Sequence, residues 1–185
     1  MKKKDINLPI EHILWLDLEM TGLSPIDDCI LEVAMLATDW EFNELASYHG
    51  IVKNDEEKLN ERFKTNSQFW DANMQSKQGL VEQNKTGNSL ANIEDEILKF
   101  IDENFKAEVP VLLAGNSIHI DRQFIIKNWP RFNRRLHYRM LDVSAWKVVF
   151  ENKYRDKFLK PDAHRALDDI RGSITELSYY LKKLK

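Results

Sequence analysis

Three apolar segments, separated only by short turns, lie between residues 12 and 52. Their sequences are HILWLDL, CILEVAMLATD and EFNELASYHGIV, with the turn signals SPIDD and DWE between them. Each segment has the length and the apolar content of a β-strand. Strands joined by so few residues pair antiparallel, because a parallel crossover needs a dozen or more residues. The sequence therefore predicts an antiparallel three-stranded meander at the start of the chain.

Helical and strand patterns alternate over the rest of the chain. SLANIEDEILKFIDENF has the spacing of an amphipathic helix, and VPVLLAGN that of a short buried strand. SIHIDRQFIIKNW predicts a helix that Asn116 or Ser117 caps and that ends near Pro130. NSQFWDANMQSKQGL is helical or irregular, and YRMLDVSAWKVVF is either a strand followed by a helix or a single helix. The last helix starts at about Ala163, and its predicted buried stripe comprises Leu167, Ile170, Ile174, Leu177 and Leu181.

This order of elements predicts an α/β or α+β domain with a mixed sheet flanked by helices. We expect one domain over residues 1–185, with a flexible segment over about residues 1–10. The start MKKKDINLPIEH lacks an apolar stretch and no apolar run could cross a bilayer, so we expect a cytoplasmic protein without a membrane partner. A net charge of −3 argues against a protein that holds long nucleic acids mainly by charge, but it leaves a short nucleic-acid substrate open.

Two carboxylates, those of Asp17 and Glu19, interrupt the first predicted strand in the stretch ILWLDLEMTGL. Alternate residues of a strand point to the same face, with Cα atoms roughly 6.5 Å apart, so these carboxylates project together. Ionised carboxylates this close repel each other unless a cation lies between them, and oxygen ligands favour Mg²⁺ or Mn²⁺. The ordinary alternative, which is far more frequent for an arbitrary Asp-x-Glu pair, is a solvent-facing pair at a strand end.

Further acidic candidates occur in two later segments. Asp121 in GNSIHIDR lies in the first or second turn of a predicted helix, where its ordinary role would be to offset the helix dipole. In PDAHRALDDI, helix phase places Asp168 opposite the buried stripe and therefore in solvent. Asp169 lies at the border of the core, so it is the better metal-ligand candidate. His164 can share a site with Asp169 only from a loop or a distorted first turn, and otherwise it is an exposed histidine.

Three segments, DLEMTGL, GNSIHIDRQF and HRALDDI, resemble the exonuclease motifs of the DEDD superfamily, in the branch with a histidine before the last aspartate. With YRMLDVS and the chain length, the resemblance narrows to the oligoribonuclease family of 3′→5′ exonucleases and covers residues 12–182. It implies an RNase H-like fold, two Mg²⁺ or Mn²⁺ ions that activate water and stabilise the leaving 3′-oxygen, and nucleoside 5′-monophosphates as products. His164 is then the implied general base, since histidine titrates near neutral pH. The implied metal ligands are Asp17, Glu19, Asp121 and Asp169.

The same resemblance implies a substrate of two to five nucleotides of single-stranded RNA, with dinucleotides preferred. Leu23 and Trp70 would contact bases, although packing in the core or at the surface is an equally weighted alternative for Trp70. Tyr138 would reach the active site of a neighbouring subunit, which implies a homodimer. A terminal 5′-phosphate would be bound by Ser117, Arg139 and Ser144.

Two other functions stay open from the sequence. One is a proofreading-type exonuclease of single-stranded DNA, and the other is a catalytically inactive nucleic-acid-binding module. A compact chain without an extended basic track favours a very short substrate. The intact acidic quartet with His164 argues against the inactive module.

Overall fold

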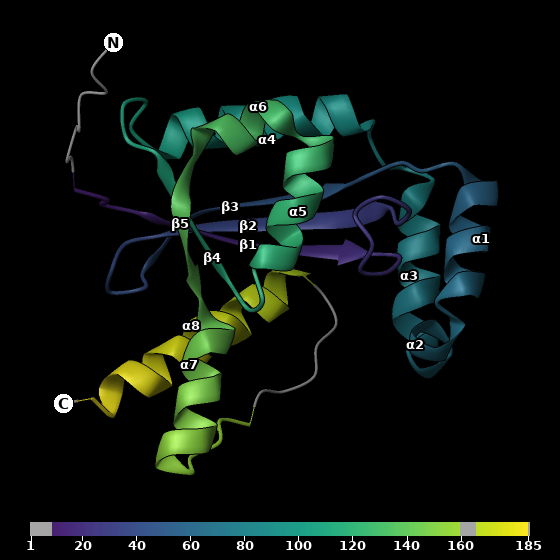
Figure 1. Cartoon of the computed structure of the whole chain (residues 1–185). Helices are drawn as coiled ribbons and strands as arrows, with labels where there is room; N and C mark the ends of the chain where they lie inside the picture. Colours follow the sequence, from purple (N-terminus) through teal and green to yellow (C-terminus); the bar gives the residue numbers. More distant parts are fainter. Residues whose placement is uncertain (1–8, 160–165, 185) are drawn as a thin grey trace.

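A five-stranded mixed sheet forms the centre of the computed structural model, which describes residues 9–159 and 166–184 (Figure 1). The strand order is β3-β2-β1-β4-β5. The first three strands pair antiparallel, whereas β4 pairs parallel with both β1 and β5. The predicted meander and mixed sheet are therefore confirmed. The strands are β1 (Ile13–Met20), β2 (Ile30–Thr38), β3 (Glu44–Ile51), β4 (Val111–Gly115) and β5 (Leu136–Asp142).

The alternation of side chains along β1 divides the core into two layers. Leu14, Leu16 and Leu18 face a cluster under α4 (Leu90–Asn104), α5 (His119–Asn128) and α6 (Pro130–Arg135). Ile13 and Trp15 face a second cluster under α7 (Val143–Val149), the π-helical turn η1 (Phe150–Tyr154) and α8 (Ala166–Lys182). All nine residues of β2 are buried, because helices cover both faces and strands flank both sides. In Figure 1 the two helical layers lie above and below the sheet.

Three further helices lie beyond the end of β1: α1 (Glu56–Thr65), α2 (Ser67–Ala72) and α3 (Met74–Asn84). They enclose a third apolar cluster, which includes Phe63, Trp70 and Leu80. The helical alternative for the segment around Trp70 is therefore correct, while α1 was not predicted. Its start is marked by Asp55, whose side chain accepts the N–H of Lys58. Within the described ranges, no helix has both the length and the apolarity that a membrane span requires.

Two helix predictions hold and one detail is wrong. Ser89 caps α4 by accepting the N–H of Asn92, and YRMLDVSAWKVVF is the strand β5 followed by α7. The predicted cap of α5 by Asn116 or Ser117 is wrong, because the N-cap is Ile118 and makes no side-chain cap bond. Both polar side chains are bonded elsewhere, to α8 and to α7.

The buried face of α8 is rotated from the predicted stripe. Ile170 and Leu177 are buried as predicted, but Leu181 is exposed and this part of the prediction is wrong. Ser173, Glu176 and Tyr180 are buried instead. The helix therefore turns a polar edge toward the sheet, and this edge continues the face on which Asp169 lies. The start predicted at Ala163 lies outside the described residues.

Candidate active site

Carboxylates from β1 and α8 come together near the carboxyl ends of the central strands. Because β1, β4 and β5 run parallel, their carboxyl ends share one edge, which is where ligands bind in open α/β sheets. Asp17, Glu19 and Asp169 each offer one carboxylate oxygen, and these three oxygens lie within 4.8 Å of one another. The side chain of Asp168 is 63% exposed, as the helix phase predicts. The structure thus brings Asp169, rather than its neighbour, to the carboxylates of β1.

Asp121 reaches the same edge from the first turn of α5. Pairing between β1 and β4 covers only the first residues of β1, and the N–H of Leu18 donates instead to Oδ1 of Asp121, at 3.0 Å. Burial raises the pKa of the Asp121 carboxyl to about 7. The bonds from backbone N–H groups oppose this shift, whereas the negative charges of Glu19 and Asp142 add to it. Asp121 is therefore a buried carboxyl held beside other carboxylates.

This donor set fits divalent cations. All four candidate ligands offer carboxylate oxygens, which hard cations such as Mg²⁺ and Mn²⁺ prefer. The raised pKa of Asp121 reflects burial beside negative charge, and a bound cation reverses that effect by favouring the ionised carboxylate. His164, which the sequence singles out as the general base, lies outside the described residues.

A tight turn after β4 forms the second part of the site. Gly115 passes so close to β1 that a Cβ there would lie 2.8 Å from the carbonyl oxygen of Leu16. Ser117 follows with a φ of 49°, a left-handed conformation that is unusual for a residue other than glycine. The turn is held by the N–H of Ser117, which donates to Oδ1 of Asp142 at 3.0 Å and to Oγ of Ser144 at 2.9 Å.

The structure brings together two of the three residues implied for phosphate binding. The hydroxyls of Ser117 and Ser144 lie 3.1 Å apart. Oδ1 of Asp142 accepts the N–H groups of both serines, and its other oxygen lies 3.5 Å from Nδ1 of His119. The third residue, Arg139, is exposed on the edge strand β5, and its guanidinium lies over the ring of Tyr138 at 5.1 Å. Tyr138 is 75% exposed, and its ring also stacks on that of His137, with centroids 4.6 Å apart.

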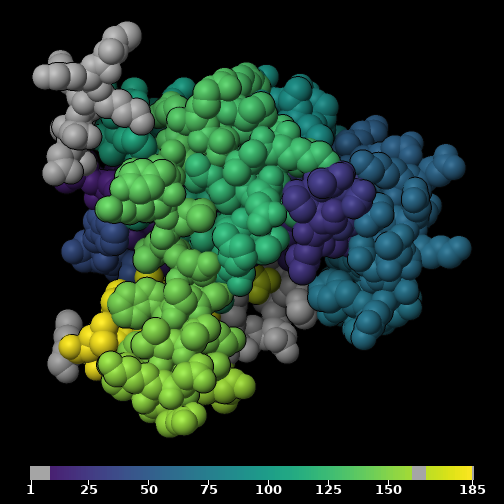
Figure 2. Space-filling model, viewed as in Figure 1, coloured from purple at the N-terminus to yellow at the C-terminus, as the bar shows by residue number. Residues whose placement is uncertain are grey.

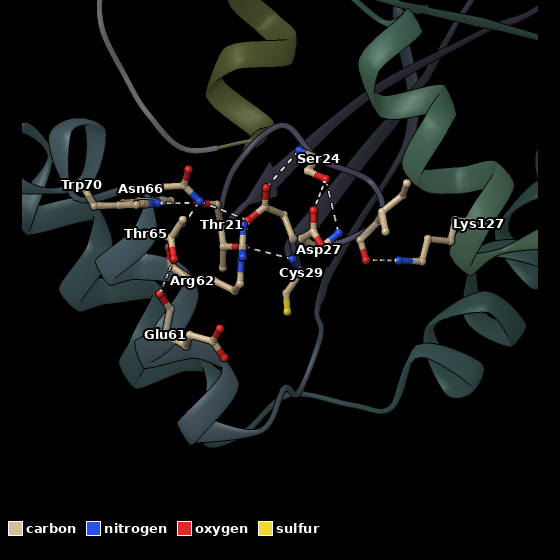
Figure 3. A network of polar contacts seen from close by, with 12 residues as sticks. Thr21, Ser24, Asp27, Cys29, Glu61, Arg62, Thr65, Asn66, Trp70 and Lys127 are labelled. Atoms are coloured by element: carbon tan, nitrogen blue, oxygen red, sulfur yellow. Dashed lines mark hydrogen bonds and ion pairs between the residues drawn. The ribbon is translucent and has the colours of Figure 1, made fainter.

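Leu23 projects from the loop over residues 21–29, which connects β1 to β2, and is 72% exposed. A network around Asp28 fixes this loop to α1 and α2 (Figure 3). The carboxylate of Asp28 accepts the Thr21 hydroxyl at 2.9 Å and the Ser24 N–H at 2.9 Å. The oxygen that accepts the Thr21 hydroxyl, Oδ1, also accepts Nε of Arg62 at 3.0 Å and the amide of Asn66 at 3.1 Å.

Trp70 is buried and helps to hold the same loop in place. Its indole N–H donates to the carbonyl oxygen of Thr21 at 2.8 Å, and the side chain is 2% exposed (Figure 3). Its ring packs edge-on against Phe63 and Phe69, with centroids 5.0 Å away in each case. The structure therefore favours packing, the second of the two roles that the sequence left open for Trp70. Through Thr21, it holds the loop that carries Leu23.

The loop is also held from its other end. The ammonium group of Lys127 on α5 donates to the carbonyl oxygen of Ile26 at 2.5 Å. Figure 2 shows the loop as a purple patch at the surface, between the green of α5 and the blue of α1–α3. The loop that presents Leu23 is thus anchored to α5, the helix that carries Asp121, and to α1 and α2, the second of which carries Trp70.

Sequence reasoning missed several residues that shape the site. Asp28, Arg62 and Asn66 lie far apart along the chain, and nothing in their local patterns indicates that they meet. For Glu176 a signal was present, because a polar residue within the apolar spacing of a helix is a candidate for burial.

Comparisons with known proteins show the family to which this chain is similar. A model of the exonuclease family matches residues 14–177. The chain is 36% identical over 174 residues to an oligoribonuclease of Streptomyces griseus, covering 92% of this chain and 85% of that protein. It is 35% identical over 175 residues to an oligoribonuclease of Pseudomonas aeruginosa, covering 92% and 94%.

Solved structures show a similar fold. An exonuclease I from Methylocaldum szegediense matches with a TM-score of 0.67 at 17% identity, over 93% of this chain. An E. coli exonuclease I in complex with single-stranded DNA matches with a TM-score of 0.65 at 14% identity, over 96% of this chain. This chain spans 40% and 41% of the length of these two proteins.

Proposed function

Because this chain belongs to the exonuclease family, and within it to the oligoribonucleases, we propose that it removes nucleotides from the 3′ end of short single-stranded RNA. This membership confirms the resemblance found in the sequence, and the mixed sheet flanked by helices is the RNase H-like fold that the resemblance implied. The chain is a nuclease with the fold of a divalent-metal-dependent exonuclease. The proposed substrates are chains of two to five nucleotides, chiefly dinucleotides, and the proposed products are nucleoside 5′-monophosphates.

The observation that carries this proposal is the convergence of carboxylates. Oxygens of Asp17, Glu19 and Asp169 lie within 4.8 Å of one another, and Asp121 is bonded to the intervening residue Leu18 at 3.0 Å. These four residues would hold two Mg²⁺ or Mn²⁺ ions. When bound, the ions supply positive charge for the attacking water and for the leaving 3′-oxygen.

The other site residues bind and orient the substrate in this proposal. His164 takes the proton from water, a role for which an imidazole is suited near neutral pH. Leu23 supports a base from its anchored loop. Tyr138 closes the active site of a second subunit, which makes the proposed enzyme a homodimer. The terminal 5′-phosphate lies against Ser117, Arg139 and Ser144.

Two neighbouring aspartates give a matched test. With a 5′-phosphorylated RNA dinucleotide and Mg²⁺, we expect Asp169→Asn to lower kcat/KM by at least ~100-fold, since a ligand of the reacting centre is lost. Asp168→Asn changes the adjacent, solvent-facing carboxylate in the same way and should stay within about twofold. Liberated mononucleotide, resolved by chromatography, is the measurement.

Metal and substrate controls complete the test. EDTA should abolish turnover, and Mg²⁺ and Mn²⁺ added separately identify the ion that restores it. Faster turnover of long single-stranded DNA than of the RNA dinucleotide would favour the proofreading alternative. No turnover of either, with all metals tried, would contradict the nuclease proposal.

A further inference from the structure

Glu176 is a carboxylate inside the protein core. Its residue is 1% exposed on the sheet-facing side of α8. Burial of a carboxylate costs free energy unless hydrogen bonds compensate for the lost water. Glu176 receives two such bonds: Oε1 accepts the hydroxyl of Tyr180 at 2.8 Å, and Oε2 accepts the side-chain amide of Asn116 at 2.9 Å. The second bond links α8 to the turn after β4.

Asn116 stands at the base of the tight turn. It follows Gly115, which touches β1, and precedes Ser117, whose φ is 49°. Its Oδ1 is buried and has no hydrogen-bond partner among the described residues. Within the described part of the chain, the Asn116 side chain is therefore bonded through its amide nitrogen alone, and a flipped amide would point its oxygen at the carboxylate of Glu176. The charge of Glu176 consequently fixes the orientation of this side chain.

We propose that Glu176 is a positioning residue for the terminal-phosphate pocket, acting through Asn116 on the turn that presents Ser117. The inference rests on the proposed function, because it assumes that Ser117 and Ser144 bind the 5′-phosphate of the substrate. A left-handed serine is maintained only when its surroundings hold it there. Asp142 and Ser144 hold Ser117 from the side of α7, and Asn116 is held from the side of α8. The same helix carries Asp169, so one rigid element connects the carboxylate cluster with the pocket.

Reversing the bond gives a sharp test. Asn116→Asp places two carboxylates against each other, whereas the double variant Asn116→Asp/Glu176→Gln restores one amide and one carboxylate in the opposite order. The Gln side chain keeps an oxygen for Tyr180 and gains a donor for Asp at 116. Substrates are the RNA dinucleotide pApA and the same dinucleotide without its 5′-phosphate, ApA. Asn128→Asp on α5 is the matched control, because within the described residues its amide bonds only the backbone oxygen of Phe124.

The proposal predicts a change in substrate preference. For Asn116→Asp we expect KM for pApA to rise about tenfold, with kcat within about twofold and KM for ApA nearly unchanged. The double variant should return KM for pApA to within about threefold of the wild type, and Asn128→Asp should leave both KM values unchanged. Thermal unfolding of each variant shows whether it is folded.

The outcomes that would contradict the role of Glu176 differ from the outcome that would contradict the proposed function. Equal losses on pApA and ApA, or no rescue by the double variant, would show that Glu176 has only a structural role. If Asn116→Asp does not fold, Asn116→Ala removes the contact without adding charge, and the ratio of the two KM values decides in the same way. A wild-type protein that cleaves neither dinucleotide would instead refute the proposed function itself.

Discussion

At Gly115 the chain passes β1 too closely for a side chain to fit. A Cβ at this residue would lie 2.8 Å from a backbone oxygen, which cannot move without disturbing β1. We expect Gly115→Ala to lower the free energy of unfolding by about 1–3 kcal/mol, because buried overpacking forces the backbone to shift. Denaturant unfolding followed by circular dichroism measures this loss.

Gly79 provides the control. It lies within α3, and a Cβ there would meet nothing within 4 Å. Gly79→Ala should therefore stabilise the protein by about 0.5–1 kcal/mol, since alanine restricts the unfolded chain and favours a helix. Equal effects of the two substitutions would contradict the close approach of β4 to β1.

Single residues differ in how far the sequence reveals them. Helix phase separates Asp169 from Asp168, because an α-helix repeats its faces regularly and the apolar stripe marks one of them. The Asp-x-Glu pair is equally readable from strand alternation. The meeting of Asp28 with Arg62 and Asn66 is not, because it depends on how α1 packs against the end of the sheet. Trp70 illustrates the same limit, since no local pattern distinguishes a stacking surface from a buried support.

Among the elements, the loop over residues 21–29 depends most on a single charge. Burial alone would raise the pKa of Asp28, but the bonds from Ser24, Thr21 and Arg62 together hold that pKa below its usual value. A carboxyl with a lowered pKa stabilises the fold at pH values above its unfolded pKa, and this contribution is lost as the pH falls through the folded pKa.

The sign of this effect can be tested with Asp28→Asn. At pH 7 we expect this variant to lose about 1–3 kcal/mol of unfolding free energy, because the charged acceptor of four donors is removed. The difference from the wild type should begin to shrink as the pH falls below about 4, where Asp28 of the unfolded wild-type chain takes up a proton, and should be lost once the pH is below the lowered pKa of the folded protein. Denaturant unfolding at both pH values is the measurement. Asp27→Asn, at an exposed neighbour, should stay within about 0.5 kcal/mol throughout.

Elements were predicted best where their pattern is local and long. The three strands of the meander and helix α4 follow from periodicity and from a Ser cap. The start of α5 was predicted wrongly, because Asn116 and Ser117 have cap-forming side chains that instead bond to α8 and α7. Tertiary contacts thus overrode a local preference in the turn that carries the candidate phosphate site.

On the scale of the whole molecule, the exposed Tyr138 gives a test of assembly. If Tyr138 of one subunit completes the site of the other, each active site takes Asp17 from one subunit and Tyr138 from its partner. Tyr138→Ala and Asp17→Ala then damage the contributions of different subunits to the same site. A mixture of the two inactive variants should recover about a quarter of the wild-type activity, because half of the randomly paired dimers contain one complete site. Turnover of the RNA dinucleotide after co-refolding measures this recovery.

The control mixes two variants that damage the same subunit's half of the site. Asp17→Ala combined with Asp169→Asn should recover no activity, since neither partner supplies an intact carboxylate cluster. Recovery in both mixtures, or in neither, would argue against a shared active site. Sedimentation of the wild type gives the mass of the assembly independently.

The sequence predicted the class of the fold but not its full strand order. Short turns determine that the first three strands pair antiparallel, so their arrangement was accessible. Placing β4 beside β1, and β5 beyond it, depends on long connections that return across the sheet, and periodicity carries no information on these.

The bond between Asp121 and the N–H of Leu18 has a practical consequence for capturing the enzyme with uncleaved RNA. Alanine at position 121 would disable the chemistry and also leave a buried amide without its acceptor, so any loss of affinity would have two causes. An inactive variant for this purpose is better made as Asp169→Asn. Asparagine preserves the shape of the side chain, and the hydrogen bond from the Leu18 N–H to Asp121 stays in place.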